Sequence, residues 1–222
     1  MLKRFTVLPK RRKGLSRLSV FYRKTKIKQI RNKFYSKAQC FKANFSSTSF
    51  TNVNFKGAIL TSCSFKNASF SQVEFLGTNL KKSNFKGASF KYCVFSGALM
   101  KKTNFSNCRF EKCTFVNTNL EAAKNMVLDS SNIVLTRYPS PVLDDELQTL
   151  VNDLRFHPKL QNSRVLHLKG GKVNGLTMQS LIDRLGVIRL KVGLKNLGGD
   201  LPYRVVTANG LCNAIDRASR SV

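Results

Sequence analysis

Acidic side chains are scarce in this sequence. Its 222 residues contain 11 Asp and Glu but 39 Lys and Arg, which gives a formal net charge of +28. A charge of this sign and size excludes an acidic surface and predicts a polyanionic partner, such as nucleic acid or an anionic membrane. The excess is greatest at the start of the chain, because residues 1–35 hold 13 basic side chains and no acidic one.

Long apolar runs are also missing. No segment approaches the roughly 18 to 20 consecutive apolar residues of a membrane-spanning helix, and residues 15–22 are interrupted by Ser16, Arg17 and Ser19. The interruption argues against the continuous apolar centre of a secretory signal. A reducing cytoplasm is therefore the expected location, with an organellar transit peptide as the alternative interpretation of the acid-free leader.

Patterns typical of catalysis and metal binding are equally sparse. The two histidines, His157 and His167, have no nucleophile in a recognisable motif nearby, and the sequence contains no Cys-x-x-Cys pair. Residues 169–175, KGGKVNG, have the glycines and lysines of a phosphate-binding loop without its spacing, so a hairpin turn is predicted there. We expect a protein that is not an enzyme and that has no cofactor and no metal site.

A five-residue repeat dominates the middle of the chain. Residues 36–120 divide into 17 blocks without an insertion or a deletion, as in KKTNF SNCRF EKCTF at 101–115. The fifth position of each block is Phe, Leu or Met, except at Cys40, and the third position is always small. We expect these two positions to face inward and the other three to face water or turn the chain.

A spacing of five fits neither an ordinary helix nor a straight strand. Helices repeat every 3.6 residues or so and strands about every two, so the large residues of a straight strand would alternate between its faces. The chain must therefore bend once per block, and four sides would close a square coil that stacks through parallel hydrogen bonds. A 20-residue superperiod supports four sides, and it is carried by Leu60, Leu80, Met100 and Leu120, and by Gly57, Gly77 and Gly97.

These blocks resemble the repeats of the pentapeptide-repeat family, in which a small residue is followed by Asn or Asp and then by Leu or Phe. The triplets ANF, AIL, ASF, TNL, SNF and TNF carry the resemblance through residues 36–120. It implies an all-β solenoid, a right-handed quadrilateral parallel β-helix. Several proteins of the family imitate DNA with acidic surfaces that occupy type II topoisomerases. The charge of this chain has the opposite sign, so that function is not expected.

The cysteines occupy inward positions of the repeat. Cys63, Cys93, Cys108 and Cys113 stand at the small third position and Cys40 at the large fifth one. There they are expected to behave as small hydrophobic side chains rather than as zinc ligands. Cys93 and Cys113 are 20 residues apart and should stack, which leaves an oxidised pair as an alternative.

The segments on either side of the repeat are expected to cover its ends, because a solenoid exposes both. Over residues 1–35 we predict a flexible basic arm (1–13) and a cap (14–35) with an apolar stripe on an interrupted helix. The stripe consists of Leu15, Leu18, Phe21 or Tyr22, Ile30 and Phe34.

Residues 121–222 predict a small mixed α/β region. The acidic residues Asp144, Asp145 and Glu146 are explained by the start of a helix, whose dipole favours negative charge. The predicted elements are helices over 143–156, 177–185 and 208–218, a strand over 187–192 and a turn over 198–200.

Lysines should align on the outside of the square coil. Stacked like charges repel unless a partner neutralises them, so aligned lysines indicate a surface that faces phosphates. The predicted columns are Lys42, Lys82 and Lys102, interrupted by Ser62; Lys81 and Lys101; and Lys66 and Lys86. The candidate nucleic-acid-binding residues are Lys10, Arg11, Arg12, Lys13, Arg23, Lys24, Lys26, Lys28, Arg31, Lys33, Lys42, Lys81, Lys82, Lys101 and Lys102.

From these features we expect a non-catalytic scaffold that binds nucleic-acid phosphates with little base selectivity. RNA or a ribonucleoprotein such as the ribosome is preferred over duplex DNA, because a basic arm can thread into folded RNA and no groove-reading motif is present. Two alternatives stay open. One is an interaction module that grips an acidic protein, and the other is a peripheral protein at an anionic membrane.

Overall fold

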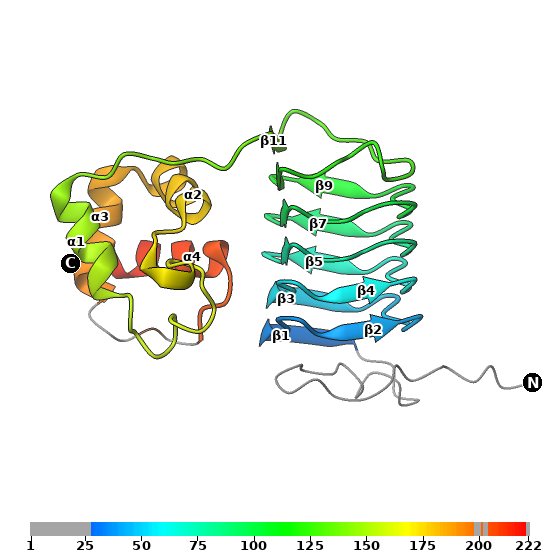
Figure 1. Ribbon diagram of the computed structural model, residues 1–222, viewed down its shortest axis with the longest axis horizontal. Coiled ribbons are helices and arrows are strands. Elements are labelled where there is room, and N and C mark those ends of the chain that lie inside the picture. Colours follow the sequence, from blue (N-terminus) through cyan, green and yellow to red (C-terminus); the bar gives the residue numbers. More distant parts are fainter. Residues whose placement is uncertain (1–27, 198–200, 202–203, 221–222) are drawn as a thin grey trace, which may run out of the picture. The chain divides into compact units, whose positions relative to one another are not determined.

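Two compact units make up the structure, the first ending at Thr136 and the second beginning at Arg137. The first is built from stacked β-strands and the second from helices (Figure 1). The residues that the computed structural model describes are 28–197, 201 and 204–220. The arm predicted over 1–13, most of the predicted cap and the turn predicted over 198–200 lie outside them.

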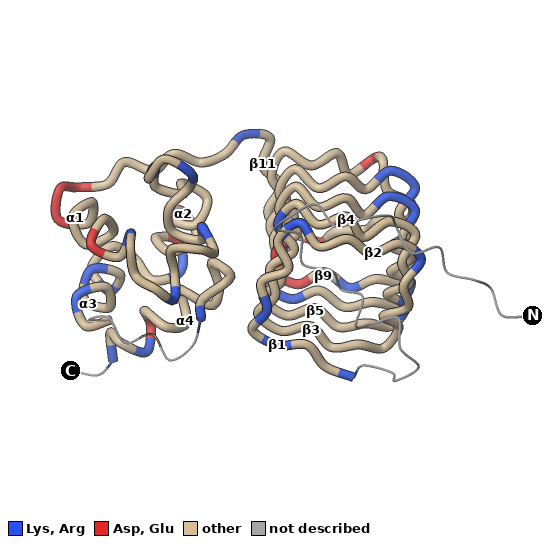
Figure 2. Tube along the Cα trace, turned by 60° about the horizontal axis from the view of Figure 1, so that its bottom comes forward, with Lys and Arg blue, Asp and Glu red and all other residues tan. Residues whose placement is uncertain are grey.

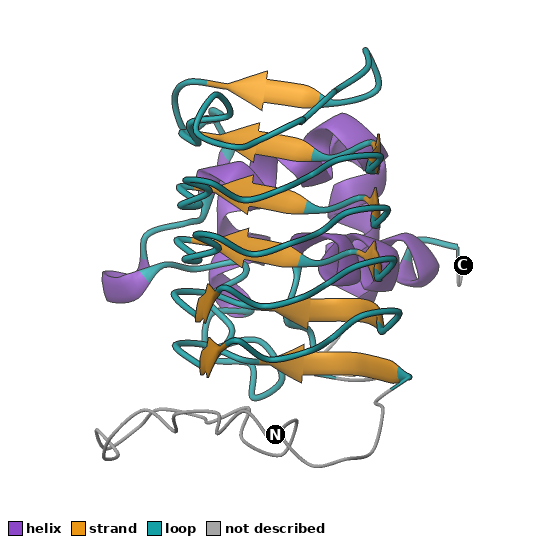
Figure 3. Ribbon diagram, turned by 90° about the vertical axis from the view of Figure 1, so that its right-hand side faces the viewer, coloured by secondary structure: helices purple, strands orange, loops and turns teal. Residues whose placement is uncertain are grey.

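The repeat folds into a parallel β-solenoid of about five turns, as the five-residue pattern predicts (Figure 3). Strands pair in parallel with a 20-residue offset, so that Phe50 pairs with Phe70 and Phe70 with Phe90. The strands are β1 (Gln29–Phe34), β2 (Gln39–Phe41), β3 (Ser49–Asn54), β4 (Ile59–Thr61), β5 (Ser69–Ser71), β6 (Glu74–Leu76), β7 (Ser89–Lys91), β8 (Val94–Ser96), β9 (Arg109–Glu111), β10 (Thr114–Val116) and β11 (Ile133–Leu135).

Strands of two adjacent sides join into one sheet through β3, which continues across a corner. This sheet has nine strands in the order β11-β10-β8-β6-β3-β5-β7-β9, with β1 paired to β3. On another side β2 and β4 form a separate pair. The remaining coils are linked by single bridges, such as those from Ile59 to Asn79 and from Asn79 to Leu99.

A residue in the left-handed region makes each corner. The second position of every block from 36 to 120 has a positive φ, from 44° at Asn117 to 62° at Lys82 among the residues other than glycine. No Val, Ile or Thr occupies this position, because β-branched side chains are disfavoured at positive φ. The polar or glycine character of the second position therefore has a backbone cause.

Phenylalanine rings stack in columns inside the coils. The ring centroids of Phe50 and Phe70 are 4.9 Å apart and those of Phe70 and Phe90 are 4.8 Å apart, with the rings nearly parallel. Phe65 and Phe85 are 4.6 Å apart in a second column. The fourth side is aliphatic, as the superperiod predicts, and its buried residues are Leu60, Leu80 and Met100.

The small third-position side chains also face inward. Several of those with a polar atom donate a hydrogen bond to the preceding coil: Thr78 Oγ1 donates to the Phe55 carbonyl and Thr103 Oγ1 to the Leu80 carbonyl, both at 2.8 Å. The acceptor lies 23 residues earlier in each case. Buried hydroxyls are thus paired in the same way in successive coils, which removes the cost of burying them.

The solenoid begins earlier than the repeat in the sequence. Strand β1 pairs with β3, and Ile30, which pairs with Phe50, is buried at the first anchor position. The helix predicted to carry Ile30 and Phe34 is therefore wrong over Gln29–Phe34. Its sequence conceals the repeat because Ile replaces Phe at the anchor and Lys33 occupies the third position, which is small elsewhere.

The last coil is shorter than the others. Strand β11 pairs with β10 at an offset of 19 residues, since Thr114 pairs with Ile133. The strand ladder therefore runs on to Leu135, but the regular 20-residue coil ends before it.

The second unit packs its helices around a separate hydrophobic core that includes Leu147, Leu194 and Leu211. Asp144 caps the first helix, because its carboxylate accepts a hydrogen bond from the Leu147 N–H at 2.9 Å. This confirms the interpretation of the acidic residues as a helix start. The elements are α1 (Asp145–Asp153), the 3-10 turn η2 (Lys169–Gly171), α2 (Gly175–Leu185), α3 (Val187–Leu197) and α4 (Ala208–Ala218).

The three helices predicted for this unit are confirmed as α1, α2 and α4, but the strand predicted over 187–192 is wrong. These residues belong to α3, whose buried residues Leu190, Leu194 and Leu197 have helical spacing. The short alternation in VIRLKV concealed this longer period. The described part of the second unit contains helices and no strand, whereas β11, which lies within the predicted α/β region of 121–222, belongs to the solenoid.

The hairpin turn predicted at 169–175 is confirmed. His167 and Val173 form an antiparallel bridge, and the Leu168 N–H donates to the Lys172 carbonyl at 2.7 Å. Turn η2 connects the two sides.

Gly77 allows the corner geometry to be tested. Its φ is +58°, and a Cβ at this position would have no atom within 4 Å, so a side chain would strain only the backbone. We expect Gly77→Ala to lower the free energy of unfolding by about 1 to 2 kcal/mol and Gly77→Asn by less, because Asn tolerates the left-handed region. Urea denaturation followed by circular dichroism measures both, and an unchanged stability of the Ala variant would contradict the corner argument.

Phe70 tests the stacked core. Because the ring is buried between two parallel neighbours, Phe70→Ala should lower the free energy of unfolding by about 3 to 5 kcal/mol. Phe156 is the control because it is 73% exposed, and Phe156→Ala should change stability by no more than about 0.5 kcal/mol. Similar denaturation midpoints for the two variants would show that the column does not stabilise the fold.

Candidate nucleic-acid interface

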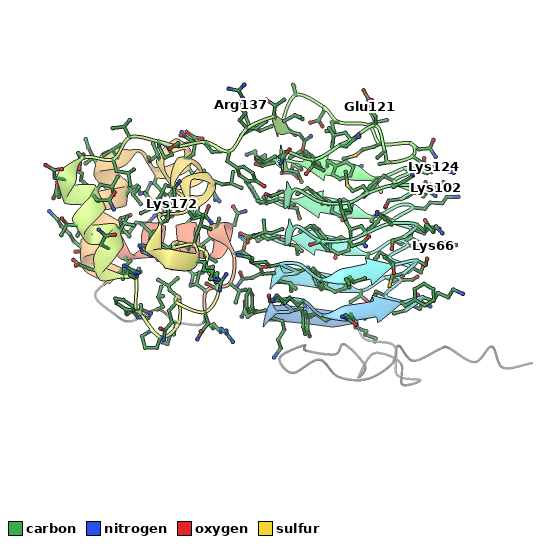
Figure 4. All side chains as sticks on the ribbon, viewed as in Figure 1. Lys66, Lys102, Glu121, Lys124, Arg137 and Lys172 are labelled. Atoms are coloured by element: carbon green, nitrogen blue, oxygen red, sulfur yellow. The ribbon has the colours of Figure 1, made fainter. Side chains whose placement is uncertain are left out.

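One side of the solenoid carries a set of exposed lysines. We call it the lysine face and define it as residues 41–46, 61–66, 81–86, 101–106 and 121–126. Figure 4 shows three of them along one edge of the solenoid, and Figure 2 shows basic segments that follow one another there. The exposed lysines are Lys42, Lys66, Lys81, Lys82, Lys86, Lys101, Lys102 and Lys124, and Glu121 is the acidic residue of the face.

Backbone hydrogen bonds between coils hold the lysine corners in register. The Lys82 N–H donates to the Lys101 carbonyl at 3.1 Å, and the Ser62 N–H donates to the Lys81 carbonyl at 3.0 Å. Lys42, Lys82 and Lys102 are the left-handed residues of their corners, so their side chains leave the coil at equivalent points. Coils of a parallel ladder are about 4.7 to 4.9 Å apart, and the lysine stems therefore start at this spacing.

The centre of the lysine face is polar and uncharged. Asn84 and Asn104 accept hydrogen bonds through Oδ1 from the N–H of Lys86 and Ser106, both at 3.0 Å. The Asn104 side chain also donates to Asn84 Oδ1 at 3.4 Å. These asparagines stabilise the backbone turn that follows them, and they place polar side chains between the lysines at the two edges of the face.

The lysines of this face have no acidic partner among the described residues, since no salt bridge involves them. Some basic residues elsewhere are paired: Lys91 lies 2.6 Å from Glu111, and Lys191 lies 2.8 Å from Asp144. The hydrogen bond from Lys191 holds the pKa of Asp144 below its ordinary value. Eight lysines and one glutamate give the lysine face a net charge of +7.

The structure brings together only part of the predicted site. Lys42, Lys81, Lys82, Lys101 and Lys102 lie on the lysine face. In contrast, Lys28, Arg31 and Lys33 are exposed at the first coil, in or next to β1, and do not belong to this face. The remaining candidates lie outside the described residues: Lys10, Arg11, Arg12, Lys13, Arg23, Lys24 and Lys26.

Three lysines of the face were not among the candidates. The sequence predicts that Lys66 and Lys86 form a column. It does not show that this column lies on the same side of the solenoid as Lys82 and Lys102, next to the other corner of that side. Lys124 forms a bridge with Asn104 and therefore continues an existing column. The 20-residue offset from Asn104 was the signal that could have identified it.

The six cysteines are free thiols. Their predicted inward positions are confirmed for the repeat, where Cys40, Cys63, Cys93 and Cys113 are buried and Cys108 is half-buried. Like the hydroxyls described above, the thiols at the third position donate to carbonyls of the preceding coil, with a distance of 3.0 Å from Cys108 Sγ to the Phe85 oxygen.

No group of three or more His, Cys, Asp or Glu side chains that could hold a metal ion occurs among the described residues. His167 is buried, and burial lowers its pKa, so the imidazole is neutral at physiological pH. In residues 28–197 and the described segments after them, the helices are all too short or too polar to span a membrane.

Comparisons with protein families identify the repeat. Models of pentapeptide repeats match residues 38–75 as eight copies and residues 80–124 as nine copies. Stacked parallel coils with left-handed corners and inward Phe or Leu define a pentapeptide-repeat β-solenoid, and the repeat region of this chain belongs to the pentapeptide-repeat family. A comparison with curated proteins finds no match.

Solved structures of this fold resemble the chain at low identity. A pentapeptide repeat protein, Rfr23, from the cyanobacterium Cyanothece 51142 is 16% identical over 40% of this chain and 62% of its own, with a TM-score of 0.30. QnrB1, a plasmid-mediated fluoroquinolone resistance protein, is 12% identical over 48% of this chain and 82% of its own, with a TM-score of 0.23. A pentapeptide repeat protein from the Arabidopsis thaliana thylakoid lumen is 21% identical over 56% and 74%, with a TM-score of 0.16.

This chain therefore spans 62% of the length of the cyanobacterial structure. At these identities and TM-scores the likeness carries no conclusion about the function of this chain.

Burial raises the pKa of Cys63 and of Cys108 from the ordinary 9.0 to about 11. We expect both thiols to resist alkylation by iodoacetamide at neutral pH in the folded protein and to react after denaturation. Because the unfolded chain releases these protons first, their contribution to stability is present below pH 9.0 and is lost as the pH rises toward about 11.

Measurement of unfolding free energy against pH tests the sign. The variant Cys63→Ser/Cys108→Ser keeps a hydrogen-bond donor at each site without a titrating thiol, so its stability should fall less over this range. Identical pH profiles for the variant and the parent protein would refute the assignment.

Proposed function

We propose that the lysine face binds the phosphate backbone of nucleic acid, with RNA or a ribonucleoprotein preferred over duplex DNA. The observation that supports this most is the set of eight exposed lysines held in register with a single acidic residue beside them. Their mutual repulsion is relieved when phosphates lie among them, and the release of the cations that had condensed on the nucleic acid favours binding. The basic residues of segment 1–35 add to the same attraction.

The chemistry of the face favours contact with phosphates rather than with bases. All of its basic residues are lysines, which act as compact point charges on flexible stems. Arginine would be expected for bidentate recognition of guanine. Phe41 is the aromatic residue of the face that is not buried, and Lys42 Nζ lies over its ring at 5.0 Å. Without a row of aromatic platforms, stacking along a whole strand is not supported.

The preference for RNA rests on the shape of the unit. The lysine face is a side of a solenoid, without a protruding helix or β-ribbon of the kind that enters the major groove of DNA. Long lysine side chains can instead follow the irregular phosphates of folded RNA, which proteins recognise largely by shape.

Two other partners would meet the same charges. An acidic protein would bind the lysine face independently of nuclease treatment, and an anionic membrane would attract it electrostatically. Membrane binding is the less favoured, because the lysine face offers little exposed apolar surface for insertion. Both are outcomes of the experiments that follow.

Paired substitutions test the lysine face directly. Lys82→Asn/Lys102→Asn removes two charges and keeps residues that tolerate the left-handed corner. Affinity for RNA, measured by fluorescence anisotropy over a range of salt concentrations, should fall severalfold. The slope of log K against log salt should become shallower by about 1.4, because each phosphate contact on a single strand contributes about 0.7.

Lys169→Asn/Lys172→Asn is the matched control, since it removes the same charge from exposed residues of the second unit. Its salt slope should stay close to that of the parent protein. Equal effects of the two pairs would show that net charge, and not the lysine face, governs binding.

Purification from the native cell with and without nuclease tests the class of partner. We expect RNA to accompany the protein at low salt and to be lost after ribonuclease treatment. A protein partner retained after nuclease treatment, in place of RNA, would overturn the proposal in favour of an acidic protein.

A further inference from the structure

A groove opens beside the lysine face at the end of the regular coils. Its volume is about 550 Å³, which falls within the range of roughly 300 to 1,000 Å³ of small-ligand sites. It lies within the first unit, between the outer side of residues 97–101 and the chain of the last coil at 117–122 and 134–136. The shortened last coil, with its 19-residue offset between β10 and β11, accounts for its position.

The floor and one side of the groove are apolar. Ile59, Asn79 and Leu99 stand above one another through successive bridges, and among the described residues this column of bridges ends at Leu99. Leu99 is 47% exposed, and Val134 at the groove is 53% exposed. Two large aliphatic side chains thus face the same open space.

The rim of the groove is polar and basic. Lys81 and Lys101 line it and also belong to the lysine face, so the two surfaces are continuous. Asn119 lines it as well, and its Oδ1 accepts a hydrogen bond from the Ala122 N–H at 3.1 Å. This contact orients the side-chain amide and leaves its N–H groups able to donate to a ligand.

We propose that the groove takes one unpaired base of a nucleic-acid strand whose adjoining phosphates lie on Lys81 and Lys101. The inference deepens the proposed function and rests on it. Leu99 and Val134 provide apolar contact for the faces of a base, the Asn119 amide can donate to its edge, and the two lysines neutralise the flanking phosphates. A free phosphate would leave the apolar floor unused, and an uncharged apolar ligand would leave the lysines unused.

A base site in the groove would make the lysine face, which is otherwise unselective, prefer single strands. Bases of a duplex are stacked and paired, and removing one from the stack costs a few kcal/mol, whereas an unpaired base enters at little cost. The position of the groove at the end of the solenoid allows one base contact for many phosphate contacts. Binding should therefore distinguish strands with bases from strands without them.

The test compares short oligouridine with an abasic strand of the same length and sugar, at one salt concentration, by fluorescence anisotropy. The parent protein should bind oligouridine at least about fivefold more tightly, which is the lower range of a single stacked base. Leu99→Asn should abolish this difference and leave the salt slope unchanged. Asn is tolerated at this place in the coil, because Asn79 occupies the equivalent position one coil earlier.

Ile59→Asn is the matched control, because Ile59 stands two coils earlier in the same column and does not line the groove. It should keep the preference for oligouridine. As a second measurement on the unaltered chain, 4-thiouridine in the oligonucleotide should crosslink to peptides that contain residues 97–101 or 134–136.

The outcomes separate this inference from the proposed function. Salt-dependent binding of both strands with equal affinity, or with crosslinks only elsewhere, would overturn the base site and leave phosphate binding intact. A preference for oligouridine that survives Leu99→Asn would also overturn it. Absence of salt-dependent binding to either strand would refute both.

Discussion

Each five-residue block has a residue in the left-handed region at its second position, and the rest of the structure depends on this constraint. It turns the chain by a corner after each short side, so that four blocks complete a coil of 20 residues and every residue stands beside its counterpart in the next coil. Phe65 stacks on Phe85 for this reason, and Lys81 stands beside Lys101 for the same reason. Core and surface are two consequences of a single register.

The same register sets like charges against one another, which is unfavourable in isolation. The fold tolerates this because the interior is filled by stacked rings and paired hydroxyls whose contacts repeat from coil to coil. The register of the backbone also fixes where each lysine stem begins. In the second unit, some lysines form salt bridges. Lys191 and Lys195 of α3 pair with Asp144 and Glu146 around the start of α1. On the lysine face, in contrast, no salt bridge within the described part of the chain involves any of the eight lysines.

Much of the solenoid could be predicted from the sequence because each inward position has its own chemical restriction. The third and fifth positions predicted the core columns and the places of the cysteines, and the 20-residue superperiod at the second and fifth positions predicted the four sides. The first strand was not predicted, because its residues differ from those of the repeat. Ile30 occupies an anchor position that holds Phe, Leu or Met in most blocks, and Lys33 occupies a third position, which is small in the blocks of 36–120. Prediction failed again over 187–192, where a short alternation within α3 imitates a strand.

The candidate site was predictable to the extent that it follows the register. Lys82 and Lys102 were found by their spacing, whereas Lys124 lies in the last coil beyond the recognisable blocks. The groove at Leu99 could not have been predicted, because it arises where the ladder stops and the chain departs from the repeat. Sequence periodicity describes the regular coils and carries no information about the space left at their end.

Lysine footprinting is the most direct measurement of the central claim that the lysine face binds nucleic acid. Acetylation of each lysine by acetic anhydride, with and without RNA, can be quantified by mass spectrometry on the full chain. The account predicts that RNA protects Lys66, Lys81, Lys82, Lys86, Lys101 and Lys102 together, while Lys169 and Lys172 of the second unit react as before. Uniform protection of all lysines, or protection confined to the second unit, would contradict it.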